Sequence, residues 1–388
     1  MADNTKIEWT DATWNPITGC SIVSPGCTNC YAMKLAGTRL QHHPSRAGLT
    51  KDSKAGPVWT GEVRFNAQWL TEPLKWKRPR MIFVCAHGDL FAEGVPHEWI
   101  DQVFAVMALA PHHTFQVLTK RPERMRDYLI GDLNASNDEP HQPHQRILDQ
   151  AYKLIGNADR FSPIALHLRA ICEASDPPLP LPNVWLGVSV EDQARAEQRI
   201  PILLDTPAAV RWISAEPLLG GLDLTDMCQG NWFFDALRGT RWHDDPEFTS
   251  RVEQFARGLD WVVAGGESGR NARPMHPDWA RSLRDQCTAA GVPFLFKQWG
   301  EWAPVPWKLE RVEGETDQSY IDRSEAECSQ FAVSKTGYIH EMDHKPWSCE
   351  RVLPQPATHQ AIKRLGKKAA GRLLDGVEHN GFPVGRAA

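Results

Sequence analysis

The sequence predicts an α/β fold, a parallel (β/α) barrel that is complete or partial, on three observations. Short apolar runs recur along the chain, each bounded by polar or turn residues, as buried strands are. Helical patterns lie between the runs, which gives about seven alternating strand and helix units. Polar residues follow each run directly, at the strand ends where parallel α/β proteins keep their active sites. An open doubly wound sheet is the main alternative.

The apolar runs define the elements of the predicted barrel, which covers residues 1–299. The expected strands are Ile7–Trp9, Met81–Val84, Thr114–Leu118, Val184–Val188, Val210–Ile213, Trp261–Ala264 and Pro293–Phe296. The expected helices are 31–40, 191–204 and the two stretches of helical periodicity that follow Pro96 and Pro277. Proline before each of the last two supports this, because proline is favoured at the start of a helix.

Two connections are longer than is usual between a strand and a helix, and we interpret them as insertions. The first, 130–182, has helical patterns at Ile147–Ile155 and Ala165–Cys172. The second, 222–259, is rich in aromatic side chains, which predicts a packed helical lid. Both insertions leave strand ends and are expected to cover the substrate, and the alternative for 222–259 is an ordinary packed excursion on the outer helices.

A C-terminal extension, 300–388, follows the last predicted strand, because the alternation of strand and helix stops there. Within it, 335–338 and 351–353 are expected to form a small hairpin or edge strand. Residues 363–376 are expected to form a terminal helix with a basic, solvated face.

Composition limits the classes of protein that remain. A formal net charge of −5 argues against a generally basic nucleic-acid-binding surface, although a local basic groove is compatible with it. Nine cysteines, most of them scattered singly, predict a reducing cytoplasm rather than a disulfide-rich secreted fold. No stretch approaches the roughly 20 apolar residues of a membrane span, so we expect a soluble chain with no membrane partner.

Three cysteines in one short stretch, Cys20, Cys27 and Cys30, are the strongest chemical signal. An iron–sulfur cubane held by three cysteines keeps one iron free for a ligand, whereas a structural zinc site takes four protein ligands. The count therefore favours an open cluster. The alternative is a zinc site completed by a ligand from elsewhere in the chain, for which the candidates are His42, His43, Cys85 and His87.

Polar residues at the predicted strand ends form the rest of the candidate site. They are Asp89, Lys120, Arg121, Ser189, Glu191, Glu216, Gly265, Gly266 and Glu267. The stretch 265–269 is too short for a dinucleotide fingerprint, so we reject a Rossmann fold. Its glycines would instead let the backbone approach a ligand closely. Glu267 would then hold a hydroxyl or ammonium group, and Arg270 or Arg273 a carboxylate.

Several stretches together resemble one known family. They are IEWTDATWNPITGC (7–20), DLF (89–91), LTKRP (118–122), GVSVE (187–191), SAEPL (214–218), GGESG (265–269) and GRLLDG (371–376). With the three cysteines, they resemble the phage-associated, three-cysteine-motif branch of the radical S-adenosylmethionine superfamily, which is distantly like the spore photoproduct lyases.

That resemblance implies a partial barrel of the radical S-adenosylmethionine type, with a 4Fe-4S cluster on the three cysteines and S-adenosyl-L-methionine on its fourth iron. The cluster, reduced by an electron donor, would generate a 5′-deoxyadenosyl radical. By position, Asp89 would hold the methionine ammonium, Lys120 or Arg121 its carboxylate, and Ser189 and Glu191 the ribose hydroxyls. Glu216 and the stretch 265–267 would complete the cofactor pocket.

The sequence departs from the commonest pattern of that superfamily at two points. Six residues separate Cys20 from Cys27, and the aromatic Tyr31 follows the third cysteine instead of preceding it. A longer loop can still surround a cubane, since cluster spacings vary between families. The function expected from the resemblance is radical chemistry on an unidentified substrate, with a nucleic-acid base as one candidate. The alternatives are a non-catalytic zinc-stabilised binding protein and a cluster-bearing scaffold for a partner protein encoded nearby.

Overall fold

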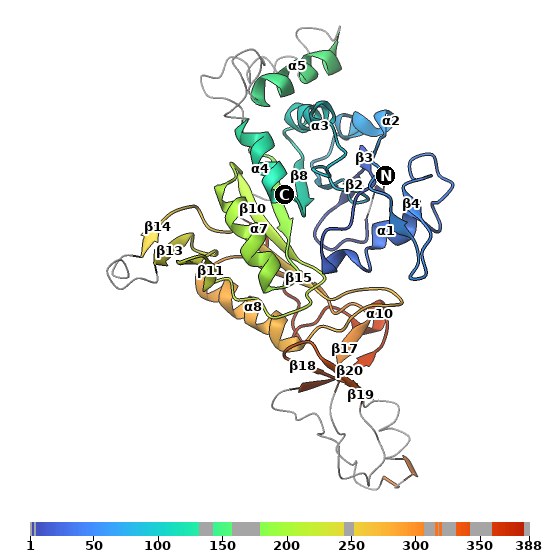
Figure 1. Cartoon of the computed structure of the whole chain (residues 1–388), viewed down its shortest axis with the longest axis vertical. Helices are drawn as coiled ribbons and strands as arrows, with labels where there is room; N and C mark the ends of the chain where they lie inside the picture. The colour runs from blue at the N-terminus through green and yellow to red at the C-terminus, as the bar shows by residue number, and fades with distance from the viewer. Residues whose placement is uncertain are drawn as a thin grey trace.

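The computed structural model of the chain describes residues 2–3, 5–131, 143–156, 179–243, 252–305, 315–316, 318–319, 331–341 and 359–383. Its centre is an eight-stranded sheet in which every strand except β1, at one edge, runs parallel to its neighbour (Figure 1). The spatial order is β1 (Ala2–Asp3), β2 (Ala12–Trp14), β7 (Met81–Val84), β8 (Thr114–Thr119), β9 (Val184–Ser189), β10 (Val210–Ala215), β15 (Trp261–Gly265) and β16 (Phe294–Gln298). The parallel strands follow one another in chain order and curl as a half-barrel, which is compatible with the predicted partial (β/α) barrel.

The predicted strands agree with the structure at six of the seven positions, and the first is wrong. Ile7–Trp9 forms a turn, in which the Thr10 amide donates to the Ile7 carbonyl at 3.3 Å, and the first parallel strand is β2. The apolar run marks burial rather than extended backbone, because Trp9 packs inside the half-barrel.

Helices α3 (His97–Leu109), α4 (Pro122–Ile130), α7 (Gln193–Asp205) and α8 (Pro277–Ala290) cover the outer face of this sheet. The short α2 (Ala67–Leu70) packs on α3, and α1 (Tyr31–Ala36) packs in a separate cluster with Leu49 and Trp59. Two 3₁₀ turns, η1 (Pro25–Cys27) and η2 (Glu72–Lys75), are also present. The helices predicted after Pro96 and Pro277 are confirmed. The helix predicted over 31–40 ends earlier, at Gly37, where a Cβ atom would lie 2.1 Å from Pro57.

Two small antiparallel sheets of two strands each precede β7. Strand β3 (Ile17–Thr18) pairs with β6 (Arg64–Phe65), and β4 (Thr50–Lys51) pairs with β5 (Val58–Trp59). Strand β3 leads directly into the segment that carries the three cysteines.

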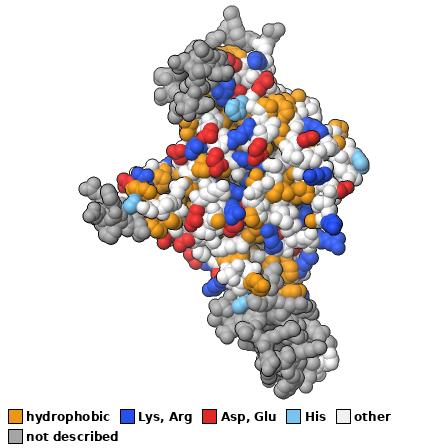
Figure 2. Space-filling view, viewed as in Figure 1, with side chains coloured by type: hydrophobic (Ala, Val, Ile, Leu, Met, Phe, Trp, Pro, Cys, Tyr) orange, Lys and Arg blue, Asp and Glu red, His pale blue; other side chains and the backbone are white. Residues whose placement is uncertain are grey.

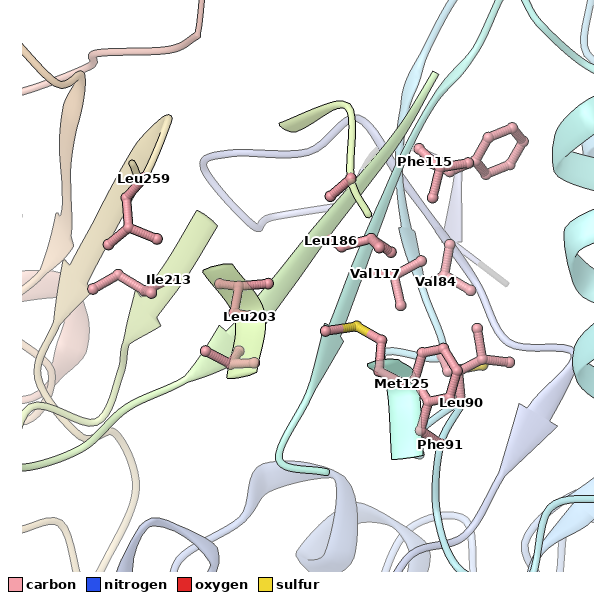
Figure 3. Packing of buried hydrophobic residues seen from close by; sticks show 14 of the residues in the cluster. Val84, Leu90, Phe91, Phe115, Val117, Met125, Leu186, Leu203, Ile213 and Leu259 are labelled. Atoms are coloured by element: carbon pink, nitrogen blue, oxygen red, sulfur yellow. The ribbon is translucent and has the colours of Figure 1, made fainter. Parts of the chain in front are cut away.

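Alternate strand residues build two cores, one on each face of the sheet. Figure 3 shows part of the outer core, in which strand residues meet the covering helices: Val84, Val117, Leu186 and Ile213 with Met125 of α4 and Leu203 of α7. The inner core is Trp9, Met81, Trp185, Trp212, Trp261, Val263 and Leu295. Its tryptophans fill the floor of the half-barrel, which leaves the carboxyl ends of the strands for polar side chains.

The first insertion contains α5 (Pro143–Ile155), which agrees with the helix expected there and packs on α3. Residues 165–172, expected to be helical, lie outside the described residues.

The second insertion forms an antiparallel sheet instead of the predicted helical lid. Its strands are β11 (Met227–Gln229), β12 (Trp232–Asp235), β13 (Thr240–His243) and β14 (Glu253–Gln254). Its aromatic side chains pair across strands, as Phe233 does with Trp242 at 6.1 Å between ring centroids. The insertion packs beside α7 and α8, where Arg238 donates to the Ala289 carbonyl at 2.7 Å (Figure 1). The predicted position over the substrate is therefore not observed for its described part.

The C-terminal extension forms a second antiparallel sheet, in the order β17 (Trp302–Pro304), β20 (His359–Arg364), β18 (Phe331–Ser334) and β19 (Ile339–Glu341). Residues 335–338, predicted to be a strand, form the turn between β18 and β19, and residues 351–353 lie outside the described part. The predicted terminal helix is wrong over 363–364, which belong to β20, and only α10 (Lys367–Ala370) is helical there. The chain then returns to the barrel, where the Phe296 amide donates to the His379 carbonyl at 3.0 Å.

Side chains of both charges cover the visible face of the molecule. Figure 2 shows lysine and arginine interspersed with aspartate and glutamate over the described part of that face. Along the described stretches, no helix combines the length and the apolar character that crossing a membrane requires.

Candidate functional site

A cleft of about 450 Å³ opens at the carboxyl ends of the parallel strands, a size within the range of small-molecule sites. Ten of the twelve predicted site residues line it: Cys20, Cys27, Cys30, Asp89, Lys120, Arg121, Ser189, Glu216, Gly266 and Glu267. The other two, Glu191 and Gly265, lie directly behind this lining. The carboxyl ends of parallel strands lie at one face of the sheet, and this rule was enough to predict the position of the cleft from the sequence.

Residues 19–31, which we call the cysteine loop, form one side of the cleft. The thiols of Cys20, Cys27 and Cys30 are free. Burial raises the pKa of Cys20 to about 12, and the other two cysteines add to that increase because they lie nearby. Burial also raises the pKa of Cys30. Metal ions bind thiolates, so loading a metal here would release protons.

The donor set suits a cluster with an open iron better than a closed zinc site. Across the described residues, no three His, Cys, Asp or Glu side chains are arranged to hold a metal ion as they stand. The three thiols of the cysteine loop nevertheless line the same cleft, and no fourth cysteine is among the described residues that line it. Three thiolates are the set that a cubane with one open iron needs.

Arg121 fastens the first part of the cysteine loop to the barrel. Its guanidinium lies 3.4 Å from the Cys20 sulfur and donates to the Ser21 carbonyl at 3.1 Å. The same group pairs with Asp89 at 3.1 Å and with Glu93 at 3.0 Å, and its side chain is 8% exposed. Burial alone would lower the pKa of Arg121, but Asp89, Cys20 and Glu93 outweigh it and raise the pKa. The guanidinium therefore stays charged beside the loop.

Asp89 holds this arrangement in place and has its own acceptor sites filled. Its Oδ1 accepts from the Phe91 amide at 2.9 Å and the Thr119 hydroxyl at 2.8 Å. Its Oδ2 accepts from the Lys120 amide and from Arg121, both at 3.1 Å. A carboxylate has about four acceptor sites, so these bonds use the capacity that the expected ammonium contact would need. Asp89 is at the predicted place, but the structure gives it a positioning role.

Glu191 holds the middle of the cysteine loop. Its Oε1 accepts from the Gly26 amide at 3.1 Å, and its Oε2 accepts from Arg199 at 3.0 Å. A Cβ atom on Gly26 would lie 3.0 Å from the Glu191 carboxyl carbon, which explains the glycine. Burial would raise the pKa of Glu191, but Lys120 and Arg199 keep it below its usual value. The carboxylate therefore binds the loop, where the resemblance implies a ribose contact.

Glu267 and Arg273 hold the last part of the loop. Glu267 accepts from the Asn29 side chain at 2.9 Å and from Arg273 at 2.6 Å. Arg273 also donates to the Pro25 carbonyl at 3.0 Å. Burial would raise the pKa of Glu267, but these hydrogen bonds lower it. Arg273, a predicted carboxylate ligand, is thus used inside the protein, whereas Arg270 is exposed and outside the lining of the cleft.

A second group of residues lining the cleft, which we call the far wall, consists of Glu216, Lys297 and Gln298. The Lys297 ammonium lies 2.8 Å from both Glu216 oxygens. The Gln298 amide donates to Glu216 Oε1 at 3.1 Å. Ser189 and Ser214, neighbours in register on β9 and β10, lie beside it in the cleft.

Lys297 and Gln298 directly follow the predicted strand Pro293–Phe296, but the sequence pattern alone gave neither of them a role. Strand periodicity carries the missing signal for Lys297, because it is two residues after Leu295 of the inner core and so faces the same side. The roles of Asn29, Glu93 and Arg199 were also missed. Asn29 and Glu93 bond partners that are 238 and 28 positions away, so no local pattern indicates them. Arg199 lies only 8 positions from Glu191, but that pair spans the connection from β9 to α7 and follows no regular helical or strand spacing.

The two predicted glycines serve the protein's own packing. A Cβ atom on Gly266 would lie 1.9 Å from the Trp299 carbonyl oxygen, so backbone approaches backbone there. A Cβ atom on Gly265 would lie 3.5 Å from the Glu216 carboxyl carbon, between Glu216 and Lys297. The glycines do permit a close approach, but at Gly266 the group that approaches is the backbone of Trp299 rather than a ligand.

The four candidates for the fourth ligand of the zinc alternative do not line the cleft. Cys85, with a φ of 54°, is buried in the outer core. His87 lies 2.6 Å from Arg46, and burial, aided by that arginine, lowers its pKa to about 4. His43 bonds Ser45 at 2.6 Å, and His42 is exposed. This arrangement gives the zinc alternative no fourth ligand from that set.

Comparison with known proteins gives one match. No curated protein and no solved structure matches the chain. A family model described as "Protein of unknown function (DUF5131)" matches residues 4–383, which is nearly the whole chain. The chain, with its half-barrel and its cysteine loop, therefore belongs to the DUF5131 family.

Proposed function

We propose that this chain is a radical S-adenosylmethionine enzyme. A 4Fe-4S cluster on Cys20, Cys27 and Cys30, reduced by an electron donor, would cleave bound S-adenosyl-L-methionine and supply a 5′-deoxyadenosyl radical that takes hydrogen from the substrate. The observation that carries the proposal is the set of three free thiols lining one cleft at the mouth of a parallel half-barrel. Free thiols also suit the reducing cytoplasm in which we expect the protein to act.

The residues around the loop would act by holding it rather than by touching the cofactor. Charged groups from the ends of β8, β9 and β15 fix its beginning, middle and end, through Arg121, Glu191 and Glu267. An N–H donor beside a cluster sulfur is one of the means by which a protein tunes a cluster, and Arg121 is in place to donate to Cys20. Attachment at three points would limit how far the loop must move to bring the three sulfurs to one cluster.

Two residues from the resemblance keep capacity for the cofactor. The Lys120 ammonium is 3.5 Å from Glu191, a loose ion pair, and its side chain is 16% exposed in the cleft. It remains our candidate for the methionine carboxylate. The Ser189 hydroxyl lines the same cleft and remains our candidate for a ribose hydroxyl. Arg121, Asp89, Glu191 and Glu267 become positioning residues in this proposal.

Anaerobic reconstitution with iron and sulfide tests the proposal through metal content. We expect about four irons and four sulfides per chain, because three cysteines hold one cubane. Cys20→Ala, Cys27→Ala and Cys30→Ala should each lose the cluster while the fold persists, since the barrel cores exclude these thiols. The matched control is Cys228→Ala, which removes an exposed thiol in the second insertion and should load normally.

Stoichiometric zinc without acid-labile sulfide would contradict the proposal and favour the zinc-stabilised binding protein. A fully loaded cluster in all three single variants would also contradict it, because the ligands would then lie elsewhere.

A further inference from the structure

The far wall has hydrogen-bonding capacity that the protein leaves unused. Lys297 has three N–H donors, and its 2.8 Å contacts with the two Glu216 oxygens use two of them. Glu216 Oε1 also accepts from Gln298, so one acceptor position remains on Oε2. The two side chains are 13% and 17% exposed, and both line the cleft. A donor and an acceptor therefore lie next to each other, open to a ligand.

Two buried polar atoms on residues that line the cleft, one of them beside this pair, have no hydrogen-bond partner among the described residues. Gln298 is 5% exposed, and its Oε1 has none, although its amide nitrogen donates to Glu216 and to Ser268. Trp9 is 3% exposed, lines the floor of the cleft, and has an unpartnered Nε1. Buried polar groups normally find a partner, so the orphan acceptor and the orphan donor indicate that a polar molecule belongs here.

The charge balance and the floor define what kind of molecule this is. Lys297 and Glu216 neutralise each other, so a charged ligand at this wall would either break a partly buried pair or be buried without compensation. An uncharged ligand avoids both costs. The same cleft also has an apolar part, which includes the rings of Trp9 and Phe83 with the Leu118 side chain and suits a planar ring.

We propose that the far wall recognises the substrate, and that the substrate carries an uncharged ring lactam. Its ring N–H would donate to Glu216, and its adjacent carbonyl would accept from Lys297. An amide edge presents a donor beside an acceptor, which is the complement of the pair on the wall. This inference rests on the proposed function in assigning the ligand as substrate, and it adds the chemical class.

Equilibrium binding to the full-length chain without metal tests the inference separately from the cluster. The probes are uridine, whose ring offers an N–H between two carbonyls, and 3-methyluridine, which has the same ring and sugar with that N–H blocked. Calorimetric titration should show uridine binding at least about tenfold more tightly than 3-methyluridine, since a hydrogen bond to a charged group is lost. Adenosine is the third probe, because the cofactor carries an adenine.

Variants of the wall give the matching controls. Lys297→Met and Glu216→Gln should each weaken uridine binding about tenfold, and the double variant should remove the preference for uridine over 3-methyluridine. The double variant removes both charges, so it leaves no unpaired ion and should fold, as a circular dichroism melt will check. Lys367→Met is the control, because Lys367 is an exposed lysine at the same cleft that lies outside the far wall.

Equal binding of uridine and 3-methyluridine, or no binding of either, would overturn the inference. Adenosine binding more tightly than uridine and competing with it would also overturn it, since the wall would then serve the cofactor. A chain that loads iron but fails these titrations would leave the proposed function standing. A chain that shows the expected titrations but loads no iron would support the recognition of a ring lactam and contradict the proposed function.

Discussion

The two sides of the cleft differ in how their polar groups are used. On the cysteine side, the charged groups form hydrogen bonds with other groups of the protein, including the loop. These groups are Asp89, Arg121, Glu191 and Glu267. On the far wall, Glu216 and Lys297 pair but keep a donor and an acceptor free. The difference teaches that a charged residue near a cofactor loop can be there to shape the loop. Unused hydrogen-bond donors and acceptors, rather than charge alone, indicate which groups bind a ligand.

The largest expected effect of a single change on the cysteine side is that of Arg121→Met. Removing this guanidinium leaves Asp89 buried and unpaired, so the free energy of unfolding should fall by about 3–5 kcal/mol. Iron loading should fall with it, because the loop loses its first attachment. Urea unfolding and iron content per folded chain check both parts. A variant that loads iron normally and unfolds at the wild-type urea concentration would show that the contacts of Arg121 with the loop are dispensable.

A smaller effect is expected for Glu191→Gln, which removes one charge at the middle of the loop. The buried Arg199 loses its charged partner, so stability should drop by about 2–3 kcal/mol. The Gln amide can still accept from Gly26, so iron content should fall only in part. Glu62→Gln, at an exposed glutamate, is the matched control and should change neither quantity. Complete loss of iron in the Glu191 variant would mean that charge, rather than the hydrogen bond, holds the loop.

The cysteine side should also make stability depend on pH in the acidic range. The pKa values of Glu191 and Glu267 lie below the usual 4.5 in the folded chain, although burial opposes this. A lowered pKa contributes stability above the unfolded value and loses it as the pH falls through the folded value. The free energy of unfolding should therefore decrease as the pH falls below about 4.5. Urea titrations across this range should show a shallower decrease in the Glu191→Gln, Glu267→Gln double variant, and an identical slope would contradict the role of these carboxylates.

The smallest expected effect is that of Cys85→Ala, which tests whether Cys85 is a fourth ligand of the cluster. Cys85 is packed in the outer core, so the loss of its sulfur should cost about 1 kcal/mol. Iron content should not change. Removal of iron as complete as in Cys20→Ala would replace the open cluster by a site with four cysteines.

The recurring apolar runs predicted most strands of the barrel. Sequence patterns failed where contacts between distant residues determine the secondary structure. Met81–Val84 and five later runs are strands because both of their faces are buried, which leaves a continuous apolar run in the sequence. Ile7–Trp9 gives the same signal yet forms a turn, since one tryptophan filling the floor is enough to require burial. In the second insertion, the cross-strand pairing of Phe233 with Trp242 is invisible in a linear pattern.

The candidate site was located from sequence more accurately than its contacts were. Ten predicted residues line one cleft because parallel strands end at one face. Which group bonds which is set by contacts such as Asn29 with Glu267, which are 238 positions apart. Spacing cannot indicate such partners, so residues expected to bind a cofactor turned out to hold the loop.

Formation of 5′-deoxyadenosine tests the central claim most directly. The reconstituted chain is incubated without oxygen with S-adenosyl-L-methionine, with and without dithionite, and the products are separated by chromatography. The account predicts 5′-deoxyadenosine and methionine in the reduced sample, and neither in the unreduced sample nor in reduced Cys27→Ala. A chain that carries a complete cluster and forms no 5′-deoxyadenosine on reduction would contradict the account and identify the protein as a cluster-bearing scaffold.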